Sequence, residues 1–529
     1  MSAFDASRPG GPPGPDRREF LTGTALFGTL AAAAPGLLAS LPAFAQDAPK
    51  SGGTLRQGMS GGATTDSLDP QTFTDWVPTN IGYQIMNGLV EIDVDNQAVP
   101  ELFESWEAKP GAVEWVFNVR KGVTFHNGKT LDADDVVYSL NLHRGENTKS
   151  AAKAVLADIV EIKKLDTNQV GITLSSGNAD LPYILSDYHL MVVPDGFTDW
   201  SKPIGTGGYA LEVFEPGVRA ITKKQGSYWK EGCAWVDSIE TIVINDTTAR
   251  TNALISGQVD VINRLDGRTV GLLSQSNVLH TVRSQAGQHA VLVMNTTMAP
   301  FDDNDVRLAL KYAIDRQKII DTVLKGNGTI GNDQPIPKTN PYYNADLPQH
   351  TLDPDKAKFH LKKAGMEGLK VSLAVSEAAF TGATDTGVLY QASAKECGVD
   401  LEVKREPSDG YWDNVWMKAP FCASYWGGRP TADQMLSIAY KSDAKWNDSF
   451  WRSGPFDKLL IEARAELDQA KRKEMYGEMQ RMIWEDGGVV IPMFIDYIDA
   501  ASNKVKGMKP HPMFDFMGQR LGEKVWLES

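Results

Sequence analysis

Residues 115–138 constrain the fold of this chain more than any other stretch. Trp115, Phe117 and Val119 alternate with polar neighbours, which is the period of a half-buried β-strand. An Asn-Gly dipeptide follows at residues 127–128 and favours a tight turn, because glycine readily adopts the positive φ angles that such turns need. The stretch therefore predicts a strand that ends in a turn.

A helix is expected to begin directly after this turn. Asp132 stands three residues ahead of Asp135, and the apolar residues Val136, Val137 and Leu140 recur on one helical face. An aspartate in the cap position accepts hydrogen bonds from the free N–H groups of the first helical turn. The pattern predicts a helix that is capped by Asp132.

Helices and strands continue to alternate along the chain, which predicts an α/β fold. One helix is closed by Gly257 and is followed at once by a strand. Strands are expected at residues 54–57, 90–94, 209–213, 239–244, 259–262, 291–295, 370–375, 399–405 and 489–494, and helices at residues 81–89, 247–256, 306–323, 354–363, 386–396, 410–418 and 456–486.

The length of 529 residues exceeds what one hydrophobic core usually supports, so at least two lobes are expected. The chain is predicted to leave the first lobe near residues 291–295 and to return near residues 489–494. We therefore assign residues 46–293 plus 491–529 to a first lobe, with a subdomain at about 95–200, and residues 294–490 to a second lobe. Two connecting strands make a hinge, which allows two lobes to close on a ligand.

The N-terminus has the features of a twin-arginine signal peptide at residues 1–45. Arg17 and Arg18 precede a weakly apolar run, and small residues lead to an expected cleavage site between Ala45 and Gln46. The run is short and interrupted for an uncleaved membrane anchor. Gln46 stands where a lipoprotein would carry cysteine, so a freely diffusing periplasmic protein is expected.

The net charge of −14 argues against nucleic-acid binding, which needs clustered lysine and arginine. Cys233, Cys397 and Cys422 are too widely spaced for a zinc or iron–sulfur motif, and they allow one disulfide at most. The eight histidines are scattered singly. No cofactor and no resident metal are predicted.

Three glycine-containing segments resemble catalytic or nucleotide-binding motifs but lack the required neighbours. Ser60 lies in a G-x-S-x-G pattern, yet no amphipathic helix follows it, as a nucleophile elbow requires. Residues 205–210 and 326–331 match dinucleotide patterns without a strand before and a helix after. A periplasmic hydrolase that uses Ser60 remains the alternative function of a different class.

This chain resembles the family 5 extracellular solute-binding proteins in four segments that occur in the same order along the chain. These segments are residues 115–138, 203–209 and 301–320 and the loop around Trp426. Proteins of this family are the receptors of peptide and nickel ABC importers. The resemblance implies the two-lobed type II periplasmic binding protein fold, α/β in class, with an extra subdomain in the first lobe. It also implies a monomer that is not an enzyme, binds a peptide by default and delivers it to permease subunits in the inner membrane.

The loop at residues 424–433 is the segment expected to contact the ligand. It follows a strand, and ligands of open α/β sheets collect at the carboxyl ends of strands. Trp426 offers a flat apolar wall, the backbone at Gly427 and Gly428 permits close approach, and Arg429 offers a planar fork for an acid group. Core packing of Trp426 and pairing of Arg429 with Asp433 are the alternatives.

The position of Arg429 limits how far the resemblance predicts the ligand. In peptide-binding relatives an acidic residue stands three positions after the tryptophan and pairs with the α-amine of the peptide. An arginine would repel that ammonium group. We therefore expect Arg429 to bind an anionic group, and a peptide, a small anionic solute or a metal chelate remain open.

Four further residues are candidates for the ligand site. Tyr411 and Trp412 precede the loop and offer aromatic surface. Glu377 follows the strand at residues 370–375 and offers an anion, and Asn295 ends the strand at residues 291–295.

Overall fold

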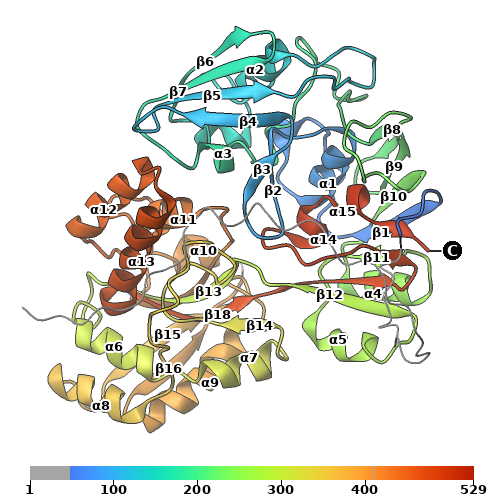
Figure 1. Ribbon diagram of the computed structural model, residues 1–529. Coiled ribbons are helices and arrows are strands. Elements are labelled where there is room, and N and C mark those ends of the chain that lie inside the picture. Colours follow the sequence, from blue (N-terminus) through green and yellow to red (C-terminus); the bar gives the residue numbers. More distant parts are fainter. Residues whose placement is uncertain (1–47, 409, 529) are drawn as a thin grey trace, which may run out of the picture. The chain divides into compact units, whose positions relative to one another are not determined.

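The computed structural model describes residues 48–408 and 410–528 (Figure 1). The predicted signal peptide and its cleavage site at Ala45 and Gln46 lie outside the described residues. Within the described ranges every helix is too short or too polar to span a lipid bilayer.

A seven-stranded sheet forms the first lobe. Its order is β12 (Leu279–Ser284), β19 (Tyr497–Ser502), β11 (Val261–Ile262), β1 (Thr54–Met59), β10 (Ser238–Val243), β9 (Arg219–Lys224) and β8 (Tyr209–Glu215). Because β1 runs parallel to both β10 and β11, the carboxyl ends of these three strands meet at one edge of the sheet.

Helices cover both faces of this sheet. The helices α4 (Thr247–Ile255) and α5 (Gly267–Leu273) pack on one face, and α1 (Trp76–Ile85), α14 (Asp515–Gly518) and α15 (Leu521–Lys524) pack on the other. A 3-10 turn, η1 (Pro70–Thr72), precedes α1. Neighbouring residues of a strand enter different cores, as Val261 and Ile262 do, because strand side chains alternate between faces.

The four-stranded sheet of the subdomain contains the strand predicted at the start of residues 115–138. Its order is β4 (Phe103–Ala108), β5 (Glu114–Val119), β7 (Gln169–Leu174) and β6 (Ile159–Asp166), with α2 (Ala133–Asn141), η2 (Ala151–Ala154) and α3 (Leu181–Ile184). Trp115 and Phe117 are buried in its core, and Gly128 has a φ of +84°. Asp132 and Asp135 form a reciprocal capping box at the start of α2, which confirms the predicted cap.

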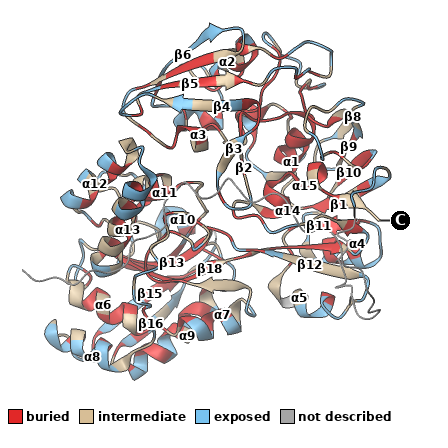
Figure 2. Cartoon of the chain, in the orientation of Figure 1, coloured by how far each residue is buried: buried red, intermediate tan, exposed pale blue. Residues whose placement is uncertain are grey.

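A six-stranded sheet forms the second lobe. Its order is β14 (Gly328–Ile330), β18 (Val489–Ile495), β13 (His289–Met294), β17 (Phe421–Trp426), β15 (Lys370–Val375) and β16 (Asp400–Arg405). One face is covered by α6 (Asn304–Tyr312), α7 (Arg316–Val323), α8 (Pro354–Lys363) and α9 (Ala383–Glu396), and the other by α11 (Ala432–Ala439), α12 (Gly454–Ala465) and α13 (Gln469–Asp486). Figure 2 shows buried strands between helices with exposed outer surfaces.

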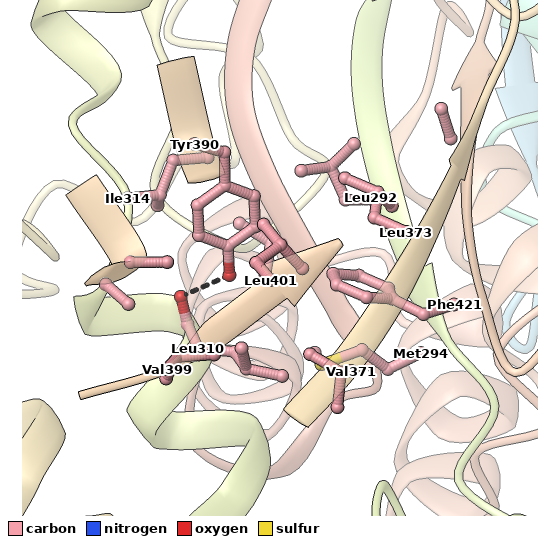
Figure 3. Packing of buried hydrophobic residues seen from close by; sticks show 14 of the residues in the cluster. Leu292, Met294, Leu310, Ile314, Val371, Leu373, Tyr390, Val399, Leu401 and Phe421 are labelled. Carbon is pink, nitrogen blue, oxygen red and sulfur yellow. Dashed lines mark hydrogen bonds between the residues drawn. The ribbon is translucent and has the colours of Figure 1, made fainter. Parts of the chain in front are cut away.

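The core of the second lobe joins strands and helices that are distant in sequence. Figure 3 shows Leu292, Leu373 and Phe421 packed with residues of α6 and α9. Within this apolar core the Tyr390 hydroxyl donates a hydrogen bond of 2.8 Å to the carbonyl of Leu310. The buried hydroxyl is thereby satisfied, as buried polar groups must be.

Four predicted helices were wrong in extent, and local caps interrupt two of them. The helix expected at residues 306–323 is split into α6 and α7, since the Asp315 side chain accepts from Lys318 N and starts a new helix. Asp468 likewise starts α13, so the helix expected at residues 456–486 is also two helices. The helix expected at residues 81–89 is α1, and that expected at residues 410–418 is the short α10 (Tyr411–Asn414).

Two short segments join the lobes. Residues 285–288 connect β12 to β13, and Asp496 alone separates β18 from β19. The Arg283 guanidinium pairs with the Asp496 carboxylate and ties the two connections together. Two strand pairs complete the fold, β2 (Val90–Ile92) with β3 (Ala98–Pro100), and β20 (Val505–Lys506) with β21 (Trp526–Leu527).

Candidate functional site

The loop that carries Arg429 lies against the first connection between the lobes. It follows β17, which runs parallel to β15 and antiparallel to β13. Gly428 packs on Gly287, and a Cβ atom added to Gly287 would stand only 2.9 Å from Gly428 Cα. This close backbone approach places the loop at the hinge, where only glycine fits.

Arg429 is a largely desolvated cation without an acidic partner in the described part of the chain. Its Nη1 donates hydrogen bonds of 3.1 Å and 3.2 Å to the carbonyls of Gly427 and Gly428. Burial lowers the pKa of Arg429, while the phenols of Tyr188, Tyr425 and Tyr497 act in the opposite direction. A guanidinium in this setting attracts an anion, because the protein leaves its charge uncompensated.

Five side chains are linked by ring contacts and electrostatic interactions, and we call them the cleft ring: Trp76, Tyr188, Arg264, Arg429 and Tyr497. The Arg264 guanidinium lies 5.4 Å from the Trp76 ring and 5.9 Å from the Tyr497 ring. The Trp76 and Tyr188 rings are 5.8 Å apart. The charge of Arg429 lowers the pKa of both Tyr188 and Tyr497, which places its guanidinium near these two phenols.

The cleft ring draws on every part of the fold. Trp76 begins α1 and Arg264 follows β11, both in the first lobe, whereas Tyr188 follows α3 in the subdomain. Tyr497 begins β19 directly after the second connection, and Arg429 belongs to the second lobe. A molecule bound inside the ring would therefore contact both lobes and the hinge.

Two buried carboxylates lie beneath Arg264. Asp515 accepts from Arg264 Nε at 2.9 Å, and Asp499 accepts from the backbone N–H of Phe516 at 2.7 Å. Burial raises the pKa of Asp499 well above its ordinary value, and the nearby Asp515 raises it further. The pKa of Asp515 is also raised by burial. The pair therefore favours retention of a proton, because two adjacent buried carboxylates repel.

The aromatic residues predicted near Arg429 differ in how much surface they offer. Trp426 is 7% exposed and packs in the core of the second lobe, and Tyr411 is 1% exposed with its hydroxyl donating to the Ala423 carbonyl. Trp412 is 38% exposed and lies 5.8 Å from the Tyr425 ring. Of these three side chains, Trp412 has the surface to meet a ligand.

The polar candidates are occupied by interactions within the protein. Both oxygens of Asp433 accept from Arg464 Nε at 3.1 Å, so Arg464 rather than Arg429 is its partner. Glu377 accepts from the backbone N–H groups of Gly382 and Thr384 and caps α9. His289 begins β13, and Asn295 follows the other end of that strand. The Asn295 side chain accepts a hydrogen bond from the backbone N–H of Thr297.

Sequence reasoning missed four members of the cleft ring. Arg264 follows a predicted strand, so the rule that located Arg429, a polar residue at the carboxyl end of a strand, also applied to it. Trp76, Tyr188 and Tyr497 carry no comparable local signal. Only the packing of distant segments brings them together.

The Ser60 loop has none of the geometry of a hydrolase in the described residues. The Ser60 backbone N–H donates to Asn263 Oδ1 at 3.0 Å, and its hydroxyl lies 3.5 Å from the same atom. A nucleophilic serine needs a histidine or another base in that place. Residues 48–408 and 410–528 also contain no group of three His, Cys, Asp or Glu side chains arranged to hold a metal ion.

Comparison with known proteins gives consistent matches along most of the chain. Residues 97–448 match the model of the bacterial extracellular solute-binding proteins, family 5. The dipeptide-binding protein of Escherichia coli K12 is 26% identical over 510 residues, covering 88% of this chain and 93% of the relative. The glutathione-binding protein GsiB of Pectobacterium atrosepticum is 25% identical, covering 87% and 93%. The structure of AgaA from A. tumefaciens R10 with agropinic acid has 26% identity and a TM-score of 0.71, covering 90% and 99%.

Proposed function

This chain belongs to family 5 of the bacterial extracellular solute-binding proteins, and from that membership we propose that it binds a peptide-like solute through an acid group held by Arg429. The protein is a solute receptor and not an enzyme. We place it in the periplasm after twin-arginine export, as a monomer that delivers its solute to the permease of an ABC importer in the inner membrane.

The observation that carries the proposal is the uncompensated Arg429 guanidinium inside the cleft ring. Relatives of this chain bind dipeptides, glutathione and agropinic acid, and each of these ligands carries at least one carboxylate. Arg429 offers a planar fork that suits a carboxylate, and its burial strengthens the pairing. A peptide α-ammonium at this position would meet repulsion instead.

Binding is proposed to close the two lobes over the solute. Within the described residues, residues 285–288 and Asp496 connect the two large sheets, and the cleft-ring residue Tyr497 directly follows Asp496. We propose the two lobes expected from the sequence, residues 46–293 plus 491–529 and residues 294–490, with their boundaries moved to these connections because β13 and β18 pair in the sheet of the second lobe. A solute bridging Arg429 and the first lobe would favour the closed arrangement, because it binds that arrangement better.

Two measurements test the proposal. Native mass spectrometry of freshly purified mature protein should detect a co-purifying solute with an acid group. Isothermal titration with that solute, with glutathione and with alanyl-alanine should then give an affinity at least about tenfold weaker for Arg429→Ala, from the loss of a charge-assisted contact. Arg219→Ala, which removes a partly exposed side chain that pairs with Glu215, is the matched control. Equal affinity in the Arg429 and Arg219 variants would reject the role of Arg429.

A metal chelate remains the second candidate, because such a solute also presents carboxylates to an arginine. Metal analysis of protein purified without added ions decides between the two. Stoichiometric metal that leaves together with an organic chelator would favour the chelate over a peptide.

A further inference from the structure

Arg264 is a second guanidinium in the cleft ring, on the opposite lobe from Arg429. Tyr497 lies between the two, since Arg264 is 5.9 Å from its ring and Arg429 interacts with its phenol. Burial raises the pKa of Tyr497 to about 12, so the phenol is neutral and does not compensate either cation. The backbone also places Arg429 near Tyr497, because Ser284 pairs with Tyr497 and Gly287 packs against Gly428, the neighbour of Arg429. Arg264 and Arg429 thus both lie near Tyr497, and its phenol neutralises neither.

The position of Arg264 is fixed by a second, fully buried arginine. Arg250 donates from Nε to the Asn263 carbonyl at 3.0 Å and from Nη2 to the Arg264 carbonyl at 3.1 Å. Its Nη1 donates a hydrogen bond of 2.7 Å to the Ile244 carbonyl. Arg250 therefore links the carboxyl end of β10 to that of β11. Arg264 has a φ of +50°, a strained value that these contacts maintain. The backbone from which the Arg264 side chain extends is thus held in place.

Asp515 compensates Arg264 only in part. Its carboxylate accepts from Arg264 Nε, and also from Asn263 Nδ2 at 3.1 Å and from Gln519 Nε2. Among the described residues no hydrogen-bond partner is found for either Nη group of Arg264, and its side chain is 36% exposed. The edge of the guanidinium between Nη1 and Nη2 therefore has two N–H donors that can bind an acid group of a ligand.

We propose that Arg264 is a second anion-binding subsite and that the solute carries two acid groups, one on Arg264 and one on Arg429. This inference rests on the proposed function and specifies its substrate class. A diacid spanning Tyr497 would join the first lobe to the second through two charge-assisted contacts. A solute with one acid group would leave one of the two cations without a partner in a closed, poorly hydrated site, and would therefore bind more weakly.

Matched pairs of small acids test the second subsite. Succinate, glutarate and adipate, each beside its own monoamide, are titrated into the mature protein by calorimetry and compared by thermal shift. The monoamide keeps the size of the diacid and removes one charge. We expect one diacid to bind at least about tenfold more tightly than its monoamide, which is the scale of one charge-assisted hydrogen bond.

Substitutions test whether Arg264 causes the preference for the diacid over its monoamide. Arg264→Gln should abolish the preference for the diacid, Arg264→Lys should keep part of it, and Arg219→Gln should leave it unchanged. The lysine variant retains the charge next to Asp515 and therefore guards against simple loss of folding. Diacids that bind no better than monoamides, or no binding by any probe at millimolar concentrations, would overturn the inference.

The outcomes separate this inference from the proposed function. Weaker binding of all probes in Arg429→Gln, with no effect of Arg264→Gln, would retain the acid-binding role of Arg429 and reject the second subsite. Unchanged binding in both variants would reject both.

Discussion

Asp180 and Arg472 form an ion pair of 2.8 Å, with both side chains 1% exposed, between the subdomain and the second lobe. Asp180 stands at the N-cap position of α3, and Arg472 lies on α13, where Tyr342 and Tyr476 accept hydrogen bonds from its guanidinium. A cavity of about 410 Å³ lies beside the pair and is lined by residues of both parts. The contact therefore links two parts that are distant in the sequence.

We expect Asp180→Ala to lower the free energy of unfolding by about 3 kcal/mol, because Arg472 would remain buried without its counter-charge. Urea unfolding monitored by circular dichroism measures the change. Asp346→Ala removes an exposed aspartate from the loop before α8, and it should stay within about 0.5 kcal/mol of the parent protein. Equal losses in the two variants would show that the ion pair adds nothing to stability.

Gly287→Ala should disturb the loop that carries Arg429. The new Cβ atom would stand 2.9 Å from Gly428 Cα, so one backbone segment must move. We expect a loss of about 1–3 kcal/mol in the free energy of unfolding, together with weaker solute binding. Gly226→Ala is the matched control, because its Cβ atom would meet nothing within 4 Å. If the two variants have the same free energy of unfolding and the same solute affinity, the loop tolerates the backbone shift.

His289 should make the protein sensitive to acid. Burial, together with a smaller effect of the Arg429 charge, lowers its pKa from 6.5 to about 4. The unfolded chain takes up this proton below about pH 6.5, whereas the folded protein does so only near pH 4, so stability falls as the pH falls through that window. The loss attributable to this side chain is about 3 kcal/mol.

His289→Gln should remove that part of the pH dependence. The free energy of unfolding, measured in urea at a series of pH values, should then fall less steeply on acidification. His143, whose pKa burial lowers to about 4, keeps its own separate contribution in the variant. A slope that matches the parent protein would contradict the assignment to His289.

Family membership confirms the predicted α/β binding-protein fold and the prediction of a solute receptor instead of an enzyme. The capping box of Asp132 and Asp135 and the strand β15 at Lys370–Val375 also form as predicted. These features depend on residues a few positions apart, so neighbouring side chains contain the necessary information. The same locality explains the errors in helix length, since the caps at Asp315 and Asp468 lie inside stretches whose apolar periodicity continues across them.

By itself the sequence determined the class of the protein, the layering of strands and helices, and the presence of an arginine at the end of a strand where relatives carry an acid. Only the tertiary structure decided that Trp426 is buried, that Asp433 pairs with Arg464, and that Arg264 and Arg429 both lie near Tyr497. The physical reason is that the members of the cleft ring come from five separate segments. Their meeting depends on how two sheets, a subdomain and two short connections pack, and no local pattern encodes such packing.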